Sequence, residues 1–117
     1  MIINNDKTIY KISAGLIAAD VEKIKIYMLG AVNGVCNTHP EERFSVRILF
    51  GGANRNWENT PMQKLYDYYI NIGKTSDYAH NKASIDAGYL LSRVLEDDSR
   101  KFAIAGKDTG KLYKLVL

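Results

Sequence analysis

The chain has very little cysteine and lacks any long apolar run. Cys36 is the only cysteine among 117 residues, so no disulfide can form within the chain and a reducing compartment is expected. No stretch approaches the roughly 18 apolar residues of a transmembrane helix. Residues 1–7 lack the basic start and apolar run of a signal peptide. We therefore expect a cytoplasmic protein that does not enter membranes.

Catalytic and metal-binding signatures are also missing. Cys36 and His39 are two potential metal ligands, whereas a structural zinc site usually needs four ligands in recognisable pairs. Asp77, His80 and Asn81 include a candidate general base, although residues of these types also cap helix ends. No set of nucleophile, base and orienting residue can be assembled. We expect no metal and no cofactor, and an enzyme is the function class that we favour least.

No block of like charge is present. The net charge is +3 and the cations are spread along the sequence, which is well short of a dedicated nucleic-acid coat. This balance is compatible with an anionic ligand without requiring one. We therefore rank nucleic-acid binding third among the function classes and expect it to be weak.

Three stretches have the alternating or β-branched pattern of strands. Residues 8–14 are rich in β-branched and aromatic side chains, and residues 43–50 alternate cleanly between an apolar and a largely basic face. Residues 101–105 and 111–117 flank a loop that contains Gly106 and Gly110. This third stretch predicts a β-hairpin.

Three further stretches have helical periodicity. Residues 16–33 carry apolar side chains at steps of three and four, although alternation over residues 22–29 also permits a strand. Thr60 and Pro61 predict a helix start, and Gly73 predicts its end. A last helix is expected from about residue 77 or 81 to residue 97.

A chain of this length and apolar content predicts one domain over residues 1–117. The elements together predict an α+β fold. We expect a mostly antiparallel sheet of four or five strands, with two or three helices packed on one face.

The most informative motif is the Gly-rich loop between the predicted strand 43–50 and the helix at Thr60. Glycines let the backbone approach a ligand, an arginine pairs with phosphate or carboxylate, and a tryptophan stacks on a planar ring. In the alternative interpretation the loop is a tight connection and its tryptophan packs over the edge of the core. The candidate ligand-binding residues in this loop are Gly51, Gly52, Asn54, Arg55, Asn56 and Trp57.

Three residues outside the loop extend this candidate site. Arg43 and Arg47 would share a face of the predicted strand, where they complete an anion site or simply cover an exposed sheet. Tyr78 belongs to a tyrosine-rich stretch, and tyrosine is favoured at ligand walls and at interfaces. The tyrosines also suggest self-association as a homo-oligomer.

The leading hypothesis is a non-enzymatic binding protein for a small anionic, nucleotide-like ligand. Phage and mobile-element factors that sequester nucleotide immune signals have this role, and the analogy concerns role alone. The alternative is a protein-binding inhibitor or adaptor that acts on a host enzyme, because exposed Tyr, Trp and Arg suit an interface hot spot.

Overall fold

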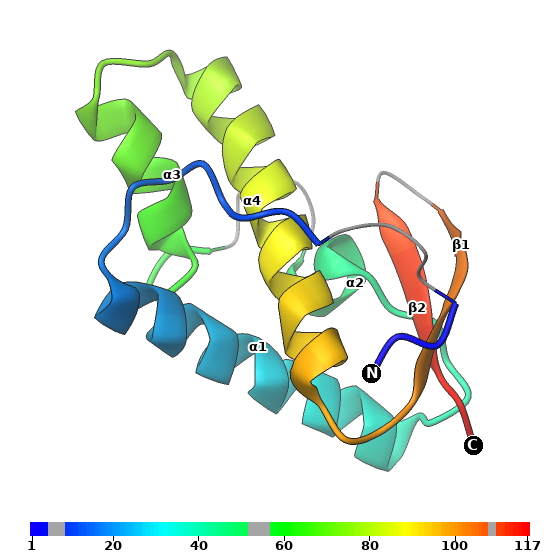
Figure 1. Cartoon of the computed structure of the whole chain (residues 1–117). Helices are drawn as coiled ribbons and strands as arrows, with labels where there is room; N and C mark the ends of the chain where they lie inside the picture. The colour runs from blue at the N-terminus through cyan, green and yellow to red at the C-terminus, as the bar shows by residue number, and fades with distance from the viewer. Residues whose placement is uncertain (5–8, 52–56, 108–109) are drawn as a thin grey trace.

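The computed structural model describes residues 1–4, 9–51, 57–107 and 110–117. The helices and strands follow along the chain in the order α1 (Ala18–Thr38), α2 (Val46–Phe50), α3 (Gln63–Asn71), α4 (Ser76–Asp97), β1 (Phe102–Lys107) and β2 (Lys111–Leu115). Figure 1 shows α3 beside α4, α1 crossing below them, and the β1–β2 hairpin at the other end of the molecule. None of the described helices is long and apolar enough to cross a membrane.

The predicted fold class is wrong. Within the described ranges the sheet has two antiparallel strands, and helices form most of the regular structure. Single-residue bridges extend the hairpin on both edges, from Ile2 to Phe102 and from Phe44 to Tyr113. The four- or five-stranded sheet therefore does not form, because two of the predicted strands are not strands.

The first wrong strand is the segment at residues 8–14, of which residues 9–14 are described. The backbone N–H groups of Ser13 and Ala14 donate to the carboxylate of Asp86 on α4, at 2.8 and 3.2 Å. A side chain thus takes the donors that a strand ladder would need. Residues 9–14 lie across α4 as an irregular segment (Figure 1).

The second wrong strand is residues 43–50. Only Phe44 pairs with the sheet, and Ser45 then begins α2 by accepting the N–H of Ile48 on its Oγ at 3.2 Å. Gly51 ends α2 in the left-handed conformation at φ 77°. Val46 and Phe50 are four residues apart, so the same apolar residues also fit one helix face.

The long helices follow the predicted periodicity. In α1 the buried residues Ile24, Met28, Val32 and Cys36 recur at steps of four, which rules out the strand alternative for residues 22–29. This helix continues beyond residue 33, where we expected it to end, because its apolar stripe reaches Cys36. The helices predicted after Thr60 and up to residue 97 are confirmed as α3 and α4.

The hairpin over residues 101–117 is also confirmed. Phe102 pairs with Leu115 and Ile104 with Tyr113, and the register shifts between Ile104 and Lys107. Phe44, Phe102 and Tyr113 pack as an aromatic cluster with ring centroids 6.1 and 6.2 Å apart. This cluster joins the hairpin to the helical part of the molecule and positions β2 beside α2 and α4.

Candidate functional site

A cavity of about 640 Å³ lies between α4, the start of α2 and the start of β2. Its volume falls in the range of small-molecule sites in proteins. The lining residues come from segments far apart in the sequence: Ser45, Val46, Arg47, Trp57, Asp77, His80, Asn81, Ser84, Ile85, Gly88, Tyr89, Leu91, Ser92, Gly110, Lys111 and Tyr113.

One face of α4 forms the largest part of the cavity wall. Ser84, Gly88 and Ser92 follow one another at steps of four, so they lie in one row along the helix. Their small side chains leave room where a larger residue would fill the space. A Cβ atom built on Gly88 meets no other atom within 4 Å.

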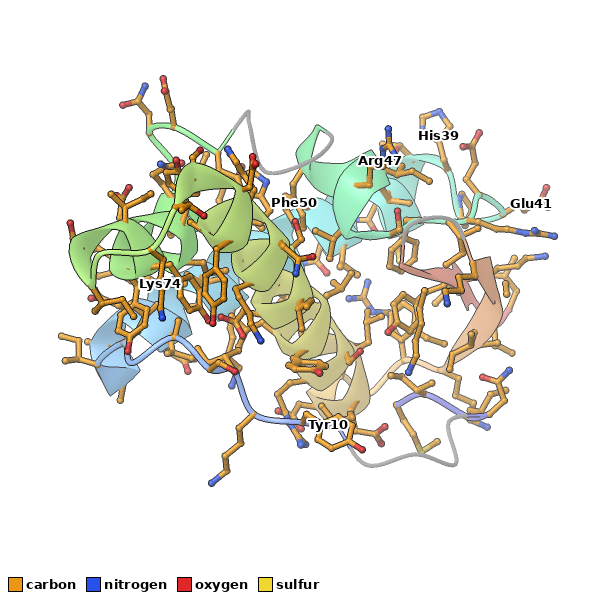
Figure 2. All side chains as sticks on the ribbon, turned by 90° about the horizontal axis from the view of Figure 1, so that it is seen from above. Tyr10, His39, Glu41, Arg47, Phe50 and Lys74 are labelled. Carbon is orange, nitrogen blue, oxygen red and sulfur yellow. The ribbon has the colours of Figure 1, made fainter. Side chains whose placement is uncertain are left out.

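Two cations border the cavity, Arg47 from α2 and Lys111 from β2. Both side chains are exposed, and neither forms an ion pair within the described part of the chain. Figure 2 shows Arg47 on α2, on the other side of α4 from Tyr10. Among the described lining residues Asp77 is the one acid, against the two cations Arg47 and Lys111, so this part of the wall favours an anion.

The cavity also has an apolar part, formed by Val46, Trp57, Ile85 and Leu91. Trp57 is 1% exposed, so it is part of the wall and not a free stacking platform. Its Nε1 has no hydrogen-bond partner among the described residues. A buried N–H left unpaired costs about 1–3 kcal/mol.

Polar groups complete the wall. The hydroxyls of Ser92 and Tyr113 are 2.6 Å apart in a buried hydrogen bond. Burial raises the pKa of Tyr113, and the bond with Ser92 partly offsets this, so its phenol is neutral near pH 7. His80 stacks on Tyr66 with ring centroids 4.6 Å apart, which holds the imidazole against α3.

The candidate residues named from the sequence divide into three groups. Arg47 and Trp57 line the cavity. Arg43 lies away from it on the outer side of the hairpin, and Gly51 forms the end of α2. The remaining loop candidates, Gly52, Asn54, Arg55 and Asn56, lie outside the described residues.

Tyr78, the last candidate, does not line the cavity. Its ring packs at 6.0 Å from Tyr69, and the Nζ atoms of Lys74 and Lys82 lie 5.0 and 5.8 Å from its centroid. Two cation–π contacts hold this ring near the start of α4. Tyr78 therefore serves as a built-in control for experiments on the cavity.

Sequence reasoning missed most of the α4 wall and Lys111 of β2. The available signal was the row of small residues at 84, 88 and 92, together with the polar cluster of Asp77, His80 and Asn81.

Among the residues that the structure covers, no three His, Cys, Asp or Glu side chains could together hold a metal ion. Burial raises the pKa of the Cys36 thiol, which keeps it protonated and poorly nucleophilic.

No family model matches the chain, and neither the curated proteins nor the solved structures include a match.

Proposed function

We propose that this protein binds a small anionic, nucleotide-like molecule in the cavity between α4, α2 and β2, without converting it. The observation that carries the proposal is the placement of Arg47 and Lys111 at the edge of a cavity with an apolar wall. A nucleotide has the matching halves, an anionic phosphate and a flat, largely apolar base.

The two cations support the anionic half of the ligand. Arginine forms paired hydrogen bonds to phosphate or carboxylate, and lysine adds a mobile point charge. Arg47 and Lys111 come from different elements, so one phosphate group could be held from two sides. Neither has an intramolecular ion pair among the described residues that a ligand would have to break.

The remaining wall supports the base. Trp57, Ile85 and Leu91 offer apolar contact area, while Asn81 and Asp77 offer donors and acceptors on the same face of α4. A carboxylate such as Asp77 accepts from the exocyclic amino group of a base. By analogy of role, the activity would sequester a signalling nucleotide.

Trp57 makes the test direct, because it is the only tryptophan in the chain and lies in the cavity wall. Its fluorescence would be titrated with adenosine and guanosine mono- and diphosphates and with cyclic mono- and dinucleotides. We expect at least one of them to give a saturable change, with native mass spectra showing one ligand per site and an unaltered ligand mass. The matching nucleoside, which lacks the phosphate, should bind far more weakly.

Arg47→Ala should weaken this binding by about 10- to 100-fold, the loss expected for a hydrogen bond to a charged group. Arg93→Ala is the matched control, since Arg93 pairs with Asp97 at 3.6 Å away from the cavity. Equal dissociation constants for the two variants would contradict the proposal. So would the absence of any fluorescence or mass change across the panel, and a chemically altered ligand would contradict its non-enzymatic part.

A further inference from the structure

The outer face of the hairpin carries a group of basic side chains, separate from the cavity. Positive charge is concentrated in this part of the sequence. Residues 100–117 contain five cations and one acid, whereas the other 99 residues contain 11 cations and 12 acids. The net charge of +3 is thus the sum of a basic C-terminal segment and a nearly neutral remainder.

Strand register places two of these cations on one face. Phe102 and Tyr113 point into the core, so alternation along the strands turns Lys101 and Lys114 outward. Lys114 pairs with Ala103, and the N–H of Val116 donates to Lys101 at 2.8 Å. Both lysines are exposed.

Arg43 joins this face from the other edge of the hairpin. Its neighbour Phe44 bridges to Tyr113 and is buried, so Arg43 faces outward. Its Nη1 lies 3.7 Å from the position of a Cβ built on Gly106, and Leu112 Cδ1 is at the same distance from that position. The guanidinium therefore lies over the outer face of the hairpin. We call Arg43, Lys101 and Lys114 the outer basic face.

The positive charges of this face are not neutralised by ion pairs among the described residues. None of its three residues forms an ion pair within residues 1–4, 9–51, 57–107 and 110–117. The strands β1 and β2 contain no acidic residue, and the nearest acids in the sequence to Arg43 are Glu41 and Glu42.

The end of the hairpin carries two further cations. Lys107 and Lys111 are directly paired across the strands. Like charges opposite one another destabilise a hairpin, and a bound polyanion would relieve this repulsion. Directly paired residues share a face of a sheet, and Lys111 borders the cavity, so this pair lies on the cavity side and not on the outer basic face.

We infer that the outer basic face binds the phosphate backbone of double-stranded nucleic acid without reading its sequence. A two-stranded ribbon is narrow enough for the major groove of B-form DNA, and lysine and arginine neutralise phosphates at its sides. Small residues lie beside these cations in β1: Ala103 and Ala105 are half-buried and Gly106 is exposed. They allow the phosphate backbone to approach closely.

The test uses a labelled duplex DNA of about 20 base pairs, with anisotropy measured between about 50 and 200 mM salt. Each phosphate contact contributes about −0.9 to the slope of log affinity against log salt. With Arg43, Lys101 and Lys114 engaged, the slope should be about −2.7. The dissociation constant should then rise about 40-fold over this range.

Replacing Arg43, Lys101 and Lys114 together by Ala should reduce the steepness of that slope by about 2 to 3. The matched control replaces Lys11, Lys23 and Lys74 by Ala, which removes the same charge from exposed positions outside the hairpin. This control should keep the wild-type slope. Circular dichroism confirms that both triple variants are folded.

Several outcomes would overturn the inference. They are no binding at the lowest salt, a wild-type slope in the Arg43/Lys101/Lys114 variant, and equal losses in both variants. Polyglutamate that displaces the duplex at equal charge concentration would overturn nucleic acid as the partner in favour of an acidic protein. Nucleotide binding in the cavity does not depend on any of these residues, so the two proposals fail separately.

Discussion

The hydroxyl of Tyr69 donates a hydrogen bond of 2.5 Å to the carboxylate of Asp86, in the interface between α3 and α4. Asp86 is fully buried and also accepts the N–H groups of Ser13 and Ala14. One carboxylate therefore connects α3, α4 and the N-terminal segment. Three donors satisfy its oxygens, which explains how a charged residue is accommodated in the helical core.

Asp86→Ala should lower the free energy of unfolding by about 3 kcal/mol or more, because three buried donors lose their acceptor. Urea denaturation measures the change. Asp67→Ala is the control, because Asp67 is exposed and accepts a hydrogen bond from the Gln63 side chain at 3.2 Å on the surface of α3. Its effect should stay within about 0.5 kcal/mol. Similar losses of unfolding free energy in both variants would contradict the role of Asp86 as the acceptor that connects these three segments.

Stability should fall at alkaline pH. Burial, and then the hydrogen bond to Asp86, raise the pKa of Tyr69 above its usual value, which is about 10 for a free tyrosine. The unfolded chain loses this proton first, so the contribution of Tyr69 is complete below about pH 10 and declines as the pH rises further. Unfolding curves between about pH 8 and 11 measure it. A Tyr69→Phe variant with the same pH dependence would count against this assignment.

Stability should also fall in acid through Asp98. Hydrogen bonds from the Arg100 side chain, at 2.8 and 3.0 Å, lower the pKa of this carboxyl. The stabilisation is therefore present above the unfolded value of about 3.9 and is lost as the pH falls through the lower folded value. Asp98→Asn should be less stable at neutral pH and should lose less stability on acidification. If the free energies of unfolding of the variant and the wild type fell in parallel with pH, other carboxyl groups would be responsible for the loss of stability in acid.

Gly88→Ala should stabilise the protein by about 0.5–1 kcal/mol, because alanine restricts the unfolded chain and favours helix. Gly30→Ala in α1 should give a similar gain. Neither added Cβ atom meets anything within 4 Å, and neither residue has a positive φ. Thermal unfolding compares the two. A destabilised Gly88→Ala variant would mean that the α4 wall is packed more tightly than described.

The parts of the fold that the sequence predicted are those with strong local signals. The buried apolar stripe of α1 runs from Ile24 to Cys36 and that of α4 from Ala79 to Leu95, and the hairpin has glycines in its loop. The two segments wrongly predicted as strands carry only short patterns, and tertiary contacts determine the structure that they adopt. Residues 9–14 donate to Asp86 and not to a strand, and Val46 and Phe50 fit a helix as well as a strand.

The candidate site was predicted only in part for a similar reason. Arg47 and Trp57 were named from the sequence and line the cavity, but Lys111 and the α4 row come from residues 27 to 54 positions after Trp57. The approach of β2 to α4 depends on the aromatic packing of Phe44, Phe102 and Tyr113. No local pattern encodes that contact.

Nucleotide titration of Trp57 fluorescence in two variants that differ in where a bulky side chain is added decides whether the ligand occupies the cavity. In Gly88→Leu the new side chain enters the cavity, whereas in Gly30→Leu it enters open space beside α1. We expect Gly88→Leu to lose binding at least 10-fold and Gly30→Leu to keep the wild-type dissociation constant. Wild-type affinity in a folded Gly88→Leu protein would contradict the assignment of the ligand to this cavity.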